Sequence, residues 1–102
     1  EWQSFIENDP LALHTITSSF LNSGRELDRL WKSHRSQIQQ PTLLMLAEND
    51  AIIENTAVRQ QVSRLGTPDL TMKVYPGARH TLEFEPNRDT VFDDLISWLS
   101  TP

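Results

Sequence analysis

Residues 41–50 read Pro-Thr-Leu-Leu-Met-Leu-Ala-Glu-Asn-Asp, an apolar run that leads directly into acidic side chains. The unbroken apolar segment 42–47 predicts a strand that is covered on both faces. Pro41 fits at the first position of such a strand, where no ladder hydrogen bond is lost. Asp50 then lies just past the carboxyl end of the strand, where parallel sheets collect their chemistry.

A second strand is predicted at residues 70–75, where Leu70, Met72 and Val74 alternate with more polar side chains. Alternation is typical of a strand with one wetter face. Pro76-Gly77 ends it, and His80 follows. A helix predicted over 55–65, ending at Gly66, joins the two strands, so a right-handed crossover makes them parallel. We therefore expect the Asp50 carboxylate and the His80 imidazole at one edge of the sheet.

The remaining elements are predicted to be helical. Asp9-Pro10 is a helix-start signal, and we expect a first helix from there to Gly24 and a second from near Arg25. A last helix is predicted over 89–99. Its apolar positions, expected to mark the buried face, are Val91, Phe92, Leu95, Ile96 and Leu99.

The order α-α-β-α-β-α indicates an α/β fold in two parts, a helical segment 1–37 and a β-α-β-α segment 38–102. Two strands alone make a poor sheet, so further strands are expected from elsewhere. The edge of the strand at 42–47 would otherwise invite another chain, and we expect the isolated chain to self-associate.

Composition excludes several classes of protein. The chain has 102 residues, one domain at most, and a net charge of −5. Such a charge argues against nucleic acid and against an anionic membrane surface as partners. No apolar run is long enough to span a membrane. The absence of cysteine excludes disulfides and thiolate metal sites, and it fits a cytoplasmic protein.

Two motifs in the sequence resemble those of a known protein family. The segment Ile38-x-x-Pro-Thr-Leu-Leu-Met-Leu-Ala-x-x-Asp50 resembles the strand-and-acid segment of α/β-hydrolases. It is most similar to the branch of serine aminopeptidases, lysophospholipases and monoacylglycerol lipases. The segment Tyr75-Pro-Gly-Ala-Arg-His80-x-Leu-x-x-Glu85 resembles the histidine loop of that branch. The leading helices resemble, less specifically, those of a cap, so segment 1–37 would be cap-like and segment 38–102 the C-terminal part of the hydrolase core.

The resemblance implies catalytic roles for Asp50 and His80, the acid and base of a Ser-His-Asp triad. Asp50 would orient the ring, and His80 would take the proton of a serine hydroxyl. Glu85 matches an acidic position of the family's histidine loop and would support His80. The alternatives are structural: a loop or N-cap carboxylate for Asp50, a surface histidine for His80 and a solvated acid for Glu85.

The nucleophile of that family is absent here. No Gly-x-Ser-x-Gly segment and no oxyanion-hole segment occurs in the sequence. In family order the serine comes first, so we expect it upstream of Glu1. The chain is then a C-terminal fragment of a serine hydrolase acting on carboxylic esters, a lipase, esterase or lysophospholipase, and inactive alone. Its substrate would be a small ester or lipid, and no cofactor is implied.

Two other functions remain open on the sequence. An aspartate at the upstream nucleophile position would make the protein a dehalogenase or epoxide hydrolase. A position without any nucleophile would make it a non-catalytic binding module on the same scaffold.

Other candidate residues have weaker signals. Glu48 is interpreted as a loop acid rather than a second catalytic carboxylate. His14 and His34 lack the spacing of zinc ligands, so no metal site is expected. An apolar set in the leading part is expected to pack in a core, or alternatively to line a substrate pocket: Trp2, Phe5, Ile6, Phe20 and Trp31.

Overall fold

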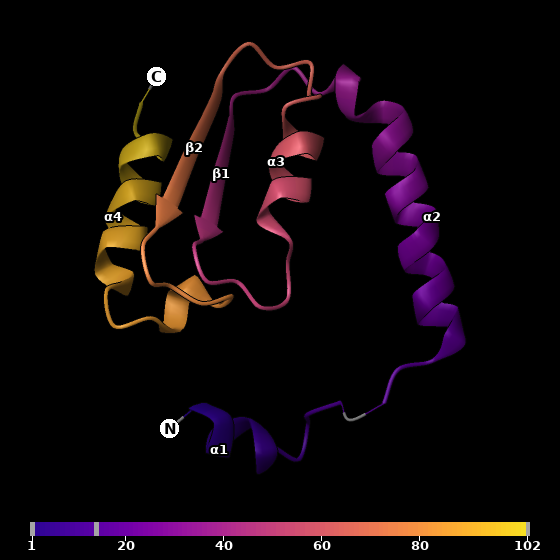
Figure 1. Ribbon diagram of the computed structural model, residues 1–102, viewed down its shortest axis with the longest axis vertical. Coiled ribbons are helices and arrows are strands. Elements are labelled where there is room, and N and C mark those ends of the chain that lie inside the picture. Colours follow the sequence, from indigo (N-terminus) through magenta and orange to yellow (C-terminus); the bar gives the residue numbers. More distant parts are fainter. Residues whose placement is uncertain (1, 14, 102) are drawn as a thin grey trace. The chain divides into compact units, whose positions relative to one another are not determined.

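The computed structural model of the chain describes residues 2–13 and 15–101 (Figure 1). The chain divides into two compact units, residues 1–32 and 33–102, whereas the sequence predicted a boundary at 37/38. Its helices and strands are α1 (Trp2–Glu7), α2 (Ser18–His34), β1 (Thr42–Ala47), α3 (Asn55–Val62), β2 (Leu70–Tyr75) and α4 (Arg88–Leu99), with 3₁₀ turns at Arg35–Gln37 and Leu82–Phe84.

The second unit is built on β1 and β2, which pair in parallel with Thr42 opposite Leu70 and Ala47 opposite Tyr75. Both strands have their predicted bounds. Figure 1 shows the two strands pointing the same way, with α3 beside β1 and α4 beside β2. The loops that follow the strands therefore leave from one end of the sheet, as predicted.

The core of this unit is small because two strands cover little area. Its buried residues are Leu46, Ala47, Tyr75, Ala78 and Val91. Strand β1 is only half-buried until its last two residues, Leu46 and Ala47, so the expectation that both faces are covered is wrong for most of its length. The described residues contain no strand on the other edge of β1, and self-association through that edge stays a prediction.

Helices α3 and α4 differ from the prediction in detail. Helix α3 ends at Val62, three residues before its predicted end. Helix α4 begins at Arg88, one residue early. Of its predicted buried face only Val91 is buried, whereas Phe92, Ile96 and Leu99 are exposed. Val91, in the first turn of α4, reaches the core, and the small sheet covers only part of the later turns.

The N-terminal part of the chain differs more from the prediction. Residues 8–17 are not helical where they are described, and the Asp9 carboxylate accepts the Leu11 N–H at 2.9 Å in a local turn. Helix α2 begins after Thr17, whose hydroxyl accepts the Phe20 N–H at 3.2 Å. Gly24 lies inside this helix. The helix start at Asp9-Pro10 and the stop at Gly24 are therefore wrong.

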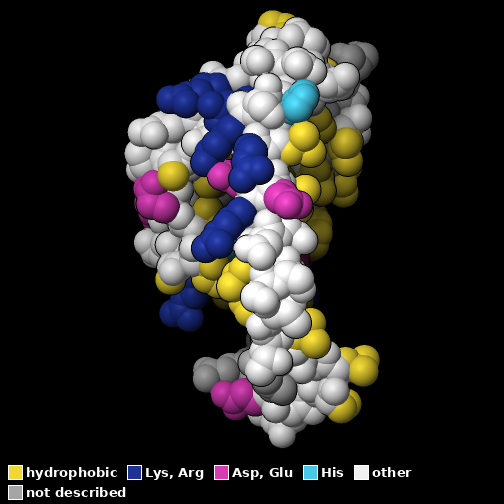
Figure 2. Space-filling view, turned by 90° about the vertical axis from the view of Figure 1, so that its right-hand side faces the viewer, with side chains coloured by type: hydrophobic (Ala, Val, Ile, Leu, Met, Phe, Trp, Pro, Cys, Tyr) yellow, Lys and Arg dark blue, Asp and Glu magenta, His cyan; other side chains and the backbone are white. Residues whose placement is uncertain are grey.

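Many large hydrophobic side chains are exposed, and Figure 2 shows them on the surface. Phe5, Ile6 and Phe20 are all more than half exposed, so the expected core packing is wrong for them. Trp31 is half-buried, and the side chain of Trp2 lies outside the described residues. Among the helices of the described residues, none is long and apolar enough to cross a membrane.

One polar cluster ties β2 to α4. The Asp94 carboxylate pairs with the Lys73 ammonium and accepts the Tyr75 hydroxyl at 3.0 Å. Tyr75 is only 4% exposed. Burial, together with the neighbouring Asp94 carboxylate, raises the pKa of Tyr75 to about 12. The hydrogen bond from Lys73, and then that from Tyr75, lowers the pKa of Asp94.

We predict that Tyr75, the single tyrosine of the chain, ionises near pH 12. The ultraviolet absorbance of tyrosinate measures this directly. Because the pKa of Tyr75 is raised in the folded state, its protonated hydroxyl stabilises the folded protein fully below pH ~10. This contribution to the free energy of unfolding is lost as the pH rises towards 12. Asp94→Asn should move the titration towards lower pH. A wild-type transition near pH ~10, with circular dichroism still showing folded protein, would contradict this.

Candidate active site

The two strand ends bring Asp50 and His80 together. Asp50 is three residues beyond β1, and His80 is five residues beyond β2. The backbone ladder continues past the strands, since the Glu48 N–H donates to the Tyr75 carbonyl at 3.1 Å and the Asn49 N–H to the Ala78 carbonyl at 2.9 Å. His80 Nδ1 lies 2.9 Å from Asp50 Oδ2, although the residues are thirty apart in sequence. The predicted meeting of these two groups is confirmed.

The Asp50 carboxylate is held from both sides. Its Oδ1 accepts the backbone N–H groups of Ile52 and Ile53, each at 2.8 Å, and its Oδ2 faces His80. Its side chain is 7% exposed. The hydrogen bond from Ile53 lowers the pKa of Asp50 most, with further lowering by His80 and Ile52. Asp50 is therefore a carboxylate at neutral pH, and its stabilising bonds weaken only as the pH falls through this lowered value.

An ionised Asp50 fixes the tautomer of a neutral His80. A carboxylate can only accept hydrogen bonds, so the Nδ1 atom facing it carries the ring proton. The lone pair is then on Nε2. The side chain of His80 is 41% exposed, which leaves room for a reacting group to approach. The pair can thus act as a general base that is oriented by an acid.

The structural alternative for Asp50 is only partly met. Asp50 does form a turn with Ile52 and Ile53, but it does not cap α3. The N-cap is Glu54, whose carboxylate accepts the N–H groups of Thr56 and Ala57. These bonds, the one from Ala57 first, lower the pKa of Glu54. Sequence reasoning missed this cap because glutamate is not among the residues preferred at that position.

Both remaining acidic candidates bind backbone N–H groups of the histidine loop. Glu85 Oε1 accepts the N–H of Arg79, the residue before His80, at 2.9 Å. Glu48 Oε2 accepts the N–H of Gly77 at 2.8 Å. Among the described residues, these bonds go to the backbone, whereas the imidazole of His80 bonds to Asp50. Glu85 lies five positions after His80 in the sequence, and it bonds to the backbone of the residue that precedes His80, so its support of His80 stays a prediction.

A surface hollow adjoins the pair. Its volume is about 380 Å³, and its lining residues come from the two loops that follow the strands: Asn49, Ala51, Ile52, Arg79, His80 and Thr81. The lining is mixed, with Ile52 apolar and 73% exposed. A reactant placed in this hollow would lie beside the imidazole.

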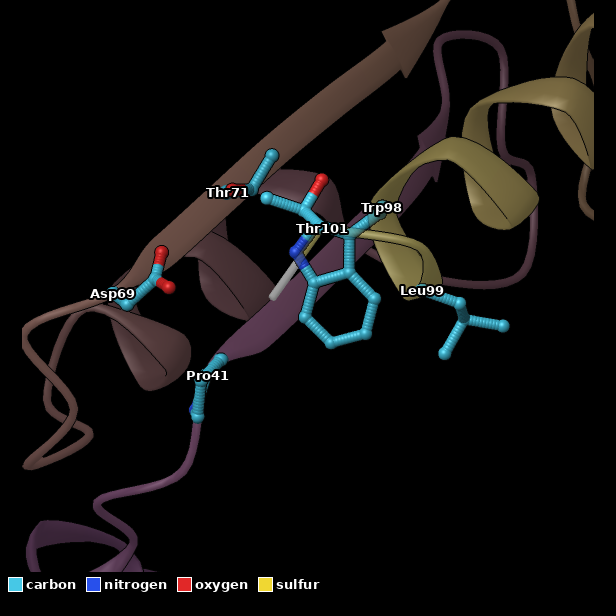
Figure 3. A pocket seen from close by; sticks show the side chains of 6 residues that line it. All are labelled: Pro41, Asp69, Thr71, Trp98, Leu99 and Thr101. Carbon is cyan, nitrogen blue, oxygen red and sulfur yellow. The ribbon is translucent and has the colours of Figure 1, made fainter.

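A larger hollow of about 450 Å³ lies at the other end of the strands, where Pro41 precedes β1 and Asp69 precedes β2 (Figure 3). The indole of Trp98, from the end of α4, forms part of its wall. Asp69 is its one ionisable lining residue, and no base accompanies it. The larger hollow therefore lies at the opposite end of the sheet from Asp50 and His80.

Of the two other histidines, the structure describes His34. The exposed His34 Nδ1 lies 2.8 Å from the hydroxyl of its neighbour Ser33. His14 lies outside the described residues. Among the residues that are described, no group of three histidine, cysteine or acidic side chains could hold a metal ion.

Comparison with known proteins gives a consistent result. The sequence profile of the serine aminopeptidase S33 family matches residues 1–87. A monoacylglycerol lipase of Mycolicibacterium smegmatis is 36% identical over 96 residues, covering 89% of this chain and 33% of the relative. A monoglyceride lipase of Saccharomyces cerevisiae is 27% identical over 112 residues, covering 96% of this chain and 35% of the relative.

The fold has a solved counterpart. The crystal structure of a soluble variant of monoglyceride lipase from Saccharomyces cerevisiae, in complex with a substrate analog, matches 96% of this chain with a TM-score of 0.74 and 22% identity. The match covers 37% of that structure's chain. This chain thus spans about a third of the length of the relatives that it matches. The predicted α/β-hydrolase fold, in its C-terminal portion, is confirmed.

Proposed function

Because this chain belongs to the serine aminopeptidase S33 family of α/β-hydrolases, we propose that it contributes the acid and the base of a Ser-His-Asp catalytic triad. Asp50 is the acid and His80 is the base. The reaction is hydrolysis of a carboxylic ester by the full-length protein that contains this chain. The serine and the oxyanion hole come from segments that precede it.

One observation carries the proposal: the 2.9 Å contact between Asp50 Oδ2 and His80 Nδ1, next to an open hollow. The carboxylate has a lowered pKa and two backbone donors that hold its other oxygen. Such an arrangement stabilises the imidazolium that forms when the base takes a proton. A chance surface pair between flexible side chains would not need the backbone bonds that fix Asp50.

The mechanism follows from the tautomer. Nε2 of His80 accepts the proton of the serine hydroxyl as its oxygen attacks the acyl carbonyl carbon. The imidazolium is stabilised by Asp50 and then gives this proton to the oxygen of the leaving alcohol. In the second half, Nε2 takes a proton from water, hydroxide attacks the acyl-serine, and the serine regains its proton. The ester becomes a carboxylic acid and an alcohol.

The substrate class is an ester of a fatty acid with a small alcohol, such as a monoacylglycerol. The support is the pair of relatives, each described as a lipase of monoacylglycerols. The leaving alcohol must lie beside His80, since Nε2 protonates it, and the hollow lined by Asn49, Arg79 and Thr81 is the space for it. A lysophospholipid remains a second substrate to assay.

We predict that a fluorophosphonate labels one serine of the full-length protein, identified by mass spectrometry. The probe reacts only with a hydroxyl that a base activates, so His80→Gln should slow labelling by at least ~10²-fold. His34→Gln is the matched control and should not change the rate. Absence of labelling with an aspartate in the nucleophile position would instead support a dehalogenase or epoxide hydrolase. Absence of any nucleophile there would support a binding module.

A further inference from the structure

We propose that Glu48 is a positioning residue, whose carboxylate fixes the loop that carries His80 to the loop that carries Asp50. Its role in catalysis rests on the proposed function, but its effect on the His80 ring does not. Sequence reasoning treated Glu48 as an ordinary loop acid. It stands directly after β1, two residues before Asp50.

The turn after β2 explains why a hydrogen-bond acceptor is needed at this point. Gly77 has φ +72°, and the Ala78 N–H bonds back to the Tyr75 carbonyl at 3.3 Å. With Pro76 before it, Gly77 occupies the third position of a type II turn. The closing hydrogen bond of such a turn uses the amide of the next residue, so the Gly77 N–H finds no acceptor within the turn. Glu48 Oε2 accepts it at 2.8 Å.

The bond from Glu48 is the first of three in succession. The Ala78 carbonyl accepts the Asn49 N–H at 2.9 Å, and the Arg79 N–H donates to Glu85 at 2.9 Å. Each of the three residues before His80 therefore has a backbone group that bonds to another part of the chain. Two of these ties, those of Glu48 and Ala78, join the same two loops that carry Asp50 and His80.

The orientation of the His80 ring depends on the bond that Glu48 makes. His80 lies in a loop and its side chain is 41% exposed, so packing alone does not fix the orientation of its ring. Hydrogen bonds to an ionised acceptor are about twice as strong as neutral ones. Losing the bond to Gly77 frees the turn and lets Nδ1 move away from Asp50. An approach of 2.9 Å tolerates little displacement before the hydrogen bond is broken.

The test is made on the 102-residue chain by NMR of the His80 imidazole nitrogens, at a pH where the ring is neutral. The wild-type ring should carry its proton on Nδ1. Glu48→Ala should shift the signals towards the Nε2–H tautomer, while Glu48→Gln, which keeps an acceptor oxygen, should restore the wild-type state. Glu83→Ala is the matched control, because Glu83 is an exposed acid of the same loop, and it should change nothing.

A second measurement needs no variant. The Gly77 N–H of the wild-type chain should exchange with solvent at least about tenfold more slowly than an unprotected amide.

In the full-length protein, Glu48→Ala should lower kcat about tenfold with KM unchanged, because the ring orientation acts on proton transfer. A His80 ring unaltered by Glu48→Ala, or an unprotected Gly77 amide, would overturn the proposal. An altered ring in a protein without esterase activity would refute the proposed function alone.

Discussion

The 102-residue chain alone is expected to hydrolyse a short-chain p-nitrophenyl ester no faster than buffer does, while the full-length protein hydrolyses it readily. Asp50 and His80 can orient and accept a proton, but the sequence has no Gly-x-Ser-x-Gly segment to provide a nucleophile. The oxyanion donors are missing as well, and these contribute about 10²–10³-fold in rate by themselves. Without a nucleophile to take the acyl group, no acyl-enzyme can form.

The comparison is a release of p-nitrophenol by equal molar amounts of the two proteins. The His80→Gln variant of the short chain serves as the control, since it measures any hydrolysis by contaminants or by surface groups. Ester hydrolysis by the wild-type chain that the variant lacks would contradict the assignment of the nucleophile to another segment. It would require a nucleophile within these residues.

Asp50→Asn in the full-length protein is expected to lower kcat by about 10⁴-fold with the fold unchanged. The amide oxygen still accepts the N–H groups of Ile52 and Ile53. The amide NH₂ group now faces Nδ1 and donates to it, which moves the ring proton to Nε2. Nε2 then has no lone pair for the serine proton. Steady-state kinetics measure the loss, and circular dichroism checks the fold.

Asp69→Asn is the matched control for this variant. Asp69 is also a loop carboxylate next to a strand, but it precedes β2 at the opposite end of the sheet. Its substitution should leave kcat within about twofold of wild type, as expected for a surface change away from the chemistry. Equal losses from both substitutions would contradict the role of Asp50.

The parts of the fold that were predicted from sequence are those with local signals. The apolar run before Glu48 set the bounds of β1, and alternation before Pro76 set those of β2. Parallel pairing then followed from the intervening helix. Because parallel strands share an edge for their carboxyl ends, the meeting of Asp50 and His80 was predictable although they are thirty residues apart.

The leading helices were not predictable from the same kinds of signal. Asp9-Pro10 has the letters of a helix start, yet the Asp9 carboxylate closes a short turn on Leu11 instead. Asp and Asn side chains serve both purposes, and the sequence alone does not distinguish them. Gly24 costs only about 1 kcal/mol inside a helix, and α2 continues through it.

The polar ties around the site depend on contacts that no local pattern reveals. Glu48 and Gly77 are 29 residues apart, and Tyr75 and Asp94 are 19 apart. Each acid has the same sequence appearance as a solvated surface group. The one available signal for Glu48 was the Pro76-Gly77 turn, which leaves an N–H for an acceptor near the end of β1.

The central claim is that Asp50 and His80 act as one unit, and a double variant of the full-length protein tests it most directly. His80→Gln removes the base, after which Asp50 has no ring to orient. The account predicts that His80→Gln combined with Asp50→Asn has a kcat within about threefold of His80→Gln alone. A further loss of about 10²-fold or more in the double variant would show that the two side chains act independently, and would contradict the account.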